Sequence, residues 1–89
     1  MHSKHRRTLR AVFADPVPAN LRWRDIETLL AALGATVEEA AGSRVSVVLN
    51  GVPAVFHRPH PSPEAKKSTV RAVRYFLIRA GVGPQGDDV

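Results

Sequence analysis

Apolar residues recur at helical spacing in three parts of the 89-residue chain. In residues 1–14, in residues 23–33 and in the segment after Ser68, they are three or four positions apart, which places them on one face of a helix. Ser3 is suited to cap the first helix, and Gly34 and Gly81 are suited to the left-handed backbone that ends the other two. The three apolar faces are Leu9, Val12 and Phe13; Trp23, Ile26, Leu29, Leu30 and Leu33; and Val70, Val73, Phe76, Leu77 and Ala80.

Between the second and third helices the spacing changes to the alternation of β-strands. Residues 35–40 fit a short strand, and residues 44–49 and 52–57 alternate on either side of Asn50-Gly51. An Asn-Gly pair favours a two-residue turn, because type I′ geometry needs positive φ at both positions. The pattern therefore predicts a hairpin, preceded by a third strand.

The turn determines which residues face one another across the hairpin. On the open face it pairs Arg44 with His57, a pairing that a slip of one residue would abolish. Pro53 has no amide hydrogen, so its strand is expected at an edge of the sheet or bulged there. The pairs on the apolar face are Leu49 with Val52, Val47 with Ala54, and Val45 with Phe56.

These elements predict an α+β fold in the order α-β-β-β-α, with a three-stranded antiparallel sheet and two helices on one of its faces. An extra N-terminal helix precedes this core. We expect residues 1–15 to form a basic helical arm outside the core, and residues 16–22 to form a proline-containing linker. Residues 23–82 would be the folded domain, and residues 83–89 a flexible tail with nothing to pack against.

Composition narrows the class of protein. The net charge is +5, and such an excess of basic side chains favours polyanionic partners. The chain has no cysteine, which excludes disulfides and thiolate zinc sites. No apolar run approaches the roughly 20 residues of a membrane span, and the basic N-terminus lacks the apolar core of a signal peptide. We therefore expect a cytoplasmic protein with no membrane partner.

From about residue 23 to residue 82 the chain resembles the HicA toxins of bacterial toxin–antitoxin systems. The resemblance rests on Gly34-Ala35 after the second helix, Gly42-Ser43 before the hairpin, His60-Pro61, and the closing helix up to Gly81-Val82. It implies a fold of the double-stranded-RNA-binding domain (dsRBD) type, cleavage of mRNA, and silencing by a HicB-like antitoxin that covers the active face. In the family the catalytic histidine directly follows Gly-Ser, whereas this chain has Arg44 there.

His57 is the obvious substitute for the missing histidine, since the predicted register places it across from Arg44. RNA can be cut without a metal ion if a histidine transfers protons and a cation stabilises the charged phosphorane. We hypothesise that His57 is the general base or acid, that Arg44 clamps the phosphate, and that His60 is a second proton-transfer group. The alternative is that Arg44 and His57 are a solvated cross-strand pair. His57-x-x-His60 lacks further ligands nearby, so no metal site and no cofactor are expected.

The start of the last helix is the predicted RNA-binding surface. In the dsRBD fold this helix start lies over phosphates, where lysines and the helix N-terminus attract anions. The alternative is an ordinary solvated helix face. The candidate RNA-binding residues are Lys66, Lys67, Arg71, Arg74, Arg58 and Ser43.

The sequence leaves three functions open. The first is a HicA-like, metal-independent mRNA endonuclease held in check by an antitoxin. The second is a non-cleaving RNA-binding module in which Arg44 marks lost catalysis, and the third is a protein-interaction domain. Trp23 fits core packing better than base stacking. The N-terminal helix fits an RNA arm, a dimer contact or an antitoxin contact, and neither the oligomeric state nor the RNA sequence preference follows from the sequence.

Overall fold

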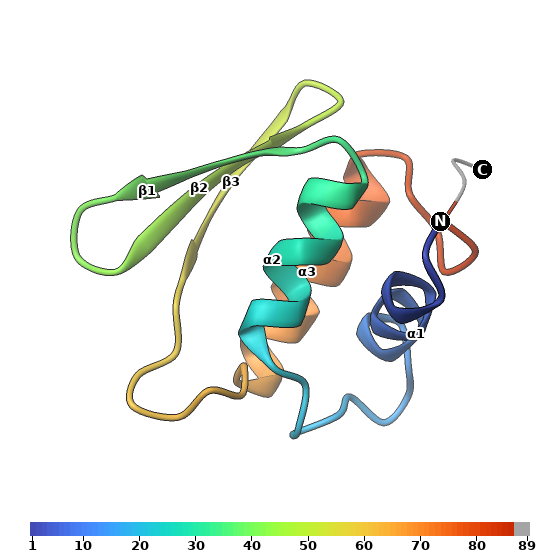
Figure 1. Ribbon diagram of the computed structural model, residues 1–89, viewed down its shortest axis with the longest axis horizontal. Coiled ribbons are helices and arrows are strands. Elements are labelled where there is room, and N and C mark those ends of the chain that lie inside the picture. The colour runs from blue at the N-terminus through green and yellow to red at the C-terminus, as the bar shows by residue number, and fades with distance from the viewer. Residues whose placement is uncertain (87–89) are drawn as a thin grey trace.

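The computed structural model describes residues 1–86, in which two helices, three strands and a final helix follow one another as the sequence predicts (Figure 1). The α+β order is confirmed: along the chain, one helix precedes and one follows the strands of a three-stranded antiparallel sheet, and an additional helix lies at the N-terminus. The elements are α1 (Ser3–Val12), α2 (Trp23–Ala32), β1 (Thr36–Ala40), β2 (Arg44–Leu49), β3 (Val52–His57) and α3 (Lys67–Arg79).

The hairpin has the predicted register. The strand order is β1-β2-β3, and Arg44 lies opposite His57 at the far end of the hairpin from the turn. Asn50 and Gly51 both adopt positive φ, at 50° and 80°, as a type I′ turn requires. Because β3 is an edge strand of this sheet, Pro53 can occupy it without removing a hydrogen bond from a second neighbour.

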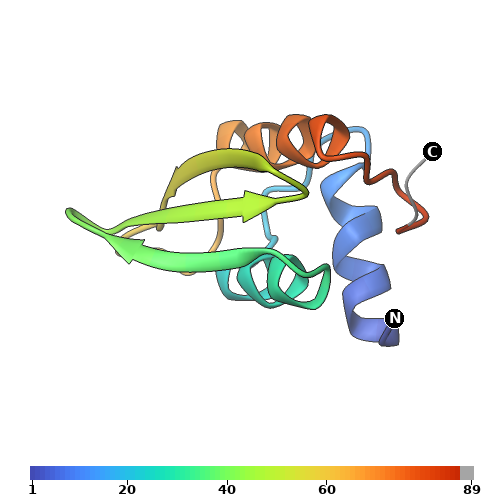
Figure 2. The same ribbon diagram turned by 90° about the horizontal axis from the view of Figure 1, so that it is seen from above.

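One face of the sheet is covered by α2 and α3, and the other face is open (Figures 1 and 2). Phe56 on β3 joins the two layers: its ring centroid lies 5.8 Å from that of Trp23 and 5.7 Å from that of Phe76. Trp23 is only 4% exposed, so the core role predicted for it is confirmed. The covered face therefore supplies the core, and the open face and the ends of the sheet are left free for functional groups.

α1 lies on the side of α2 and α3 that faces away from the sheet (Figure 2). Leu9 and Val12 are fully buried and belong to the same core as the sheet residues. The expectation that this helix stays outside the core is therefore wrong. Its N-cap also differs from the predicted one, because His2 rather than Ser3 caps it, with Nδ1 accepting from the amide of Lys4.

The last helix agrees with expectation, whereas the segment after it differs. α3 begins at Lys67 and ends before Gly81, whose φ of 84° is the left-handed backbone predicted for it. Gly83 is buried, and the amide of Gly86 donates to its carbonyl, so this part of the predicted tail is packed. The remainder of that prediction, residues 87–89, lies outside the described residues.

Candidate nucleic-acid interface and active site

A hollow of about 360 Å³ lies where β3 ends and α3 begins. The chain leaves the sheet at His57, passes through a proline-containing loop, and returns as α3 at Lys67, so that both sides of the hollow come from one continuous segment. We call it the histidine hollow. Its lining residues are His57, Arg58, Pro59, His60, Lys66, Ser68 and Thr69. The structure thus brings together four of the predicted site residues around one concave surface: His57, Arg58, His60 and Lys66.

The N-terminus of α3 opens into the histidine hollow. The N-cap residue Lys66 makes no side-chain capping hydrogen bond, and the first turn contains no acidic residue. The first amides of a helix have no partner within the helix and carry the positive end of its dipole, so they can bind an anion. Ser68 and Thr69 add hydroxyl donors at the same place. These two residues were not among the candidates for RNA binding predicted from the sequence. Hydroxyl side chains in the first turn of a basic helix could have indicated them.

Arg44 and His57 are cross-strand neighbours at the open face of the sheet, and both are exposed. The Arg44 side chain folds back on the preceding turn, where its Nε donates to the carbonyl of Ala41 at 2.8 Å. His57 also lines the histidine hollow, whereas Arg44 does not. The pair is therefore split: His57 faces the hollow, and Arg44 flanks it from the sheet.

Arg58 is held by two carboxylates. Its Nε donates to Glu27 Oε2 at 2.8 Å and its Nη1 donates to Glu39 Oε1 at 2.8 Å, which ties the end of β3 to α2 and β1. Trp23 Nε1 donates to the same Glu27 carboxylate. These bonds, Glu27 first, raise the pKa of Arg58 further above its usual range, so the guanidinium stays charged. Glu27 and Glu39 largely balance the charge of Arg58. Its guanidinium would therefore attract a phosphate less strongly than an unpaired arginine would.

The Glu27–Arg58 contact makes stability depend on pH. Hydrogen bonds from Arg58 hold the pKa of Glu27 below its ordinary value of 4.5, against the opposing effect of burial. A lowered pKa in the folded state stabilises the protein above the ordinary pKa, and this contribution is lost as the pH falls through the folded-state pKa.

We therefore expect Glu27→Gln to be less stable than the wild type by about 1 kcal/mol at pH 7, as for a partly exposed ion pair. The difference should begin to shrink as the pH falls past 4.5 and vanish at lower pH. Urea unfolding over a pH series measures it. Glu38→Gln, at an exposed position of β1, is the control and should show no such trend. A Glu27→Gln deficit that stays constant with pH would contradict the assignment.

The other predicted RNA-binding residues divide into two groups. Lys67 and Arg71 are exposed on α3 and free to meet a ligand. Arg74 instead points to α1, where Nε donates to the carbonyl of Val12 at 2.8 Å and Nη2 to that of Ala14 at 2.7 Å. Ser43 lies in the turn before β2 and its carbonyl accepts from the Arg58 amide at 2.9 Å. In this structure Arg74 and the Ser43 backbone make hydrogen bonds that hold parts of the fold together.

Within residues 1–86, no three histidine or acidic side chains lie together as a metal ion would require. None of the described helices has the length and apolar character needed to cross a membrane.

The order α-β-β-β-α, with both core helices on one face of an antiparallel sheet, makes this a small α+β domain. Residues 23–82 match the family model for the HicA toxin of bacterial toxin–antitoxin systems. The chain belongs to the HicA toxin family, whose members pair with antitoxins. The match begins at α2 and leaves α1 outside. Comparisons with curated proteins and with solved structures gave no match.

Proposed function

We propose that this HicA-family toxin binds RNA in the histidine hollow and cleaves mRNA without a metal ion. The observation that carries the proposal is the hollow itself, which is lined by two histidines, a lysine and an uncapped helix N-terminus. Histidines can exchange protons near neutral pH, and the cationic wall can hold a phosphate. Action on mRNA would take place in the cytoplasm.

The chemistry would follow from these roles. One histidine accepts the proton of a ribose 2′-hydroxyl, whose oxygen attacks the adjacent phosphorus. The phosphorus–5′-oxygen bond then breaks, and the other histidine donates a proton to the leaving 5′-oxygen. The products are a 2′,3′-cyclic phosphate and a free 5′-hydroxyl. Lys66 and the first amides of α3 stabilise the negative charge of the phosphorane.

Arg44 favours a second candidate function. It occupies the position that the family resemblance gives to a catalytic histidine, and it lies outside the lining of the histidine hollow. If His57 does not replace that histidine, the hollow would still bind phosphate through Lys66 and α3. The protein would then be an RNA-binding module without cleavage, with Arg44 as an additional phosphate contact on the sheet. A HicB-like antitoxin that covers the hollow would block either activity.

Incubation of the purified protein with a long labelled mRNA in EDTA tests the proposal. Cleavage that leaves cyclic phosphate ends, together with a salt-sensitive mobility shift, is the expected result. Intact RNA with the same mobility shift would favour the non-cleaving module. Intact RNA without a shift would overturn RNA binding and favour a protein-interaction domain. A protein prepared in parallel with His57→Ala/His60→Ala controls for contaminating ribonuclease.

The lysines at the start of α3 should account for part of the salt dependence of binding. For single-stranded nucleic acid each phosphate contact contributes about 0.7 to the slope of log affinity against log salt, so Lys66→Ala/Lys67→Ala should reduce that slope by about 1.4. The measurement is fluorescence anisotropy of a labelled RNA over a salt series. An unchanged slope would remove these lysines from the interface.

A further inference from the structure

α1 carries basic side chains on two different sides. Lys4 and Arg7 lie on the side that meets the start of α2, in a shallow depression that they share with Asp25. Arg6 and Arg10 lie on another side, in a depression shared with Pro84 and Gln85. The helix therefore presents two separate basic surfaces, and only the first adjoins the segment that leads into α2.

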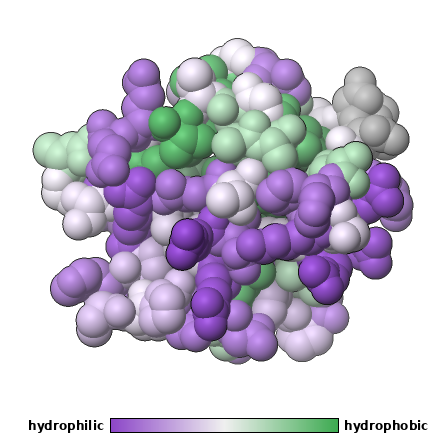
Figure 3. All heavy atoms as spheres, viewed as in Figure 1, coloured by the Kyte–Doolittle hydropathy of each residue, from purple (hydrophilic) through white to green (hydrophobic). Residues whose placement is uncertain are grey.

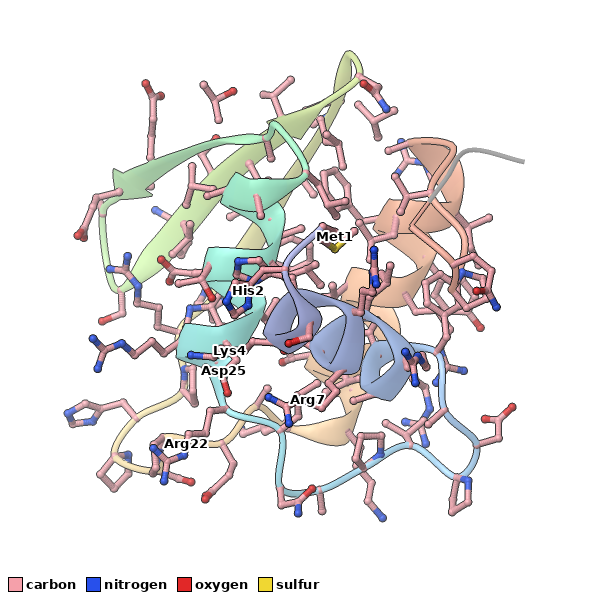
Figure 4. The ribbon with its side chains drawn as sticks, turned by 45° about the vertical axis from the view of Figure 1, so that its right-hand side comes forward. Met1, His2, Lys4, Arg7, Arg22 and Asp25 are labelled. Carbon is pink, nitrogen blue, oxygen red and sulfur yellow. The ribbon has the colours of Figure 1, made fainter. Side chains whose placement is uncertain are left out.

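The segment before α2 connects that first surface to the histidine hollow. The amide of Trp23 donates to the carbonyl of Pro63 at 3.0 Å, and the amide of Ala65 donates to that of Leu21 at 2.8 Å. Arg22 thus lies directly opposite Glu64 in an antiparallel bridge, two residues before Lys66. Figure 4 shows Arg7, Lys4 and Asp25 close to the start of α2, with Arg22 on the same side of the molecule. The bridge therefore connects Arg22 to the segment that leads to Lys66 in the hollow, and the neighbouring depression connects the start of α2 to Lys4 and Arg7 on α1.

The charge of this surface is mostly uncompensated. Within residues 1–86, no carboxylate lies in ion-pair distance of Arg7 or Arg22, and both are exposed. Lys4 pairs with Asp25 at 3.4 Å, an exposed contact that screens it only in part. The Glu64 carboxylate beside Arg22 accepts a hydrogen bond from the Ser62 hydroxyl. Figure 3, which has the same viewpoint as Figure 1, shows that hydrophilic side chains cover much of the face formed by α1 and α2.

The geometry points to an extended RNA footprint: a strand that leaves the histidine hollow runs past Arg22 and reaches Arg7 and Lys4 on α1. We name these three residues the α1 track. On this inference α1, which lies outside the family match, contacts RNA and not a second copy of the chain or an antitoxin. The inference rests on the proposed function in that its ligand is RNA. A linear polyanion fits the arrangement because positive groups extend from the hollow, where a phosphate is proposed to bind, through the segment of Arg22 to α1.

The test is RNA binding by Arg7→Ala/Arg22→Ala in a His57→Ala background, which keeps the RNA intact. Fluorescence anisotropy with a long single-stranded RNA over a salt series should show the slope of log affinity against log salt falling by about 1.4 for the two lost phosphate contacts. Arg6→Ala/Arg10→Ala in the same background is the matched control. It removes the same charge from the pocket on the other side of α1 and should leave the slope unchanged.

The outcomes separate this inference from the proposed function. If the His57→Ala parent binds RNA and the two double variants have the same slope, the α1 track is overturned while RNA binding stands. If the parent binds no RNA at all, the proposed function and the track both fail. Binding to phosphatidylserine vesicles that only Arg7→Ala/Arg22→Ala loses, with RNA affinity unchanged, would assign the surface to anionic membranes and overturn the track. Circular dichroism of each variant confirms folding.

Discussion

Replacement of His57 by alanine is expected to slow RNA cleavage by at least about 100-fold, the usual lower bound for loss of a general acid or base. His57 is the end residue of β3 and lines the histidine hollow beside the start of α3, where a bound phosphate would lie. His60→Ala should cause a loss of similar size if it supplies the second proton transfer. The measurement is the initial rate of mRNA cleavage in EDTA.

The dependence of the rate on pH distinguishes a catalytic histidine from a structural one. Two histidines in opposite protonation states give a bell-shaped profile, and removal of either should abolish one limb. His2→Ala is the control, because His2 is the exposed N-cap residue of α1 and lies outside the hollow. If His57→Ala and His60→Ala retain the wild-type rate and profile, the two-histidine mechanism is wrong, and cleavage, where observed, must come from other residues.

The hairpin and its register were predictable because short-range rules determine them. Asn50-Gly51 selects the turn, and the turn with the alternation of Val45, Val47 and Leu49 leaves one register that buries the apolar side. The helices followed from the spacing of their apolar residues. The approach of His60 and Lys66 to His57 follows from the same hairpin, since the chain must return from the end of β3 to α3 across a short loop.

The partners of individual arginines were not predictable, because they depend on contacts between distant parts of the chain. Arg58 reaches Glu27, which precedes it by 31 residues, and Arg74 reaches Val12, which precedes it by 62. Sequence patterning identifies both as basic and therefore as candidates for phosphate. Only the folded structure shows that Arg58 is bound by carboxylates and Arg74 by backbone carbonyls. For the same reason the burial of α1 was missed: its apolar stripe is short, and its partners come from α2 and α3.

Loss of Arg74 is expected to destabilise the protein strongly, because this side chain holds α1 against the core. Its guanidinium donates to the carbonyls of Val12 and Ala14 at the C-terminal end of α1, where positive charge is favoured by the helix dipole. The side chain is only 16% exposed, so truncation would leave partly buried carbonyls without a donor. Arg74→Ala should therefore lower the free energy of unfolding by about 2–3 kcal/mol. For a domain of this size that corresponds to a fall in melting temperature of roughly 10–20 °C.

Thermal and urea unfolding measure this loss, with Arg71→Ala as the control on the same helix. Arg71 is exposed, so its removal should change stability by no more than about 0.5 kcal/mol. Arg74→Lys keeps the charge but cannot donate to two carbonyls from one planar group, so it should recover only part of the loss. Equal stability of Arg74→Ala and Arg71→Ala would show that α1 holds its place through Leu9 and Val12 alone. If Arg74 holds α1 in place, Arg74→Ala should also loosen the α1 track, and RNA affinity should fall although Arg74 is not one of the three residues of that track.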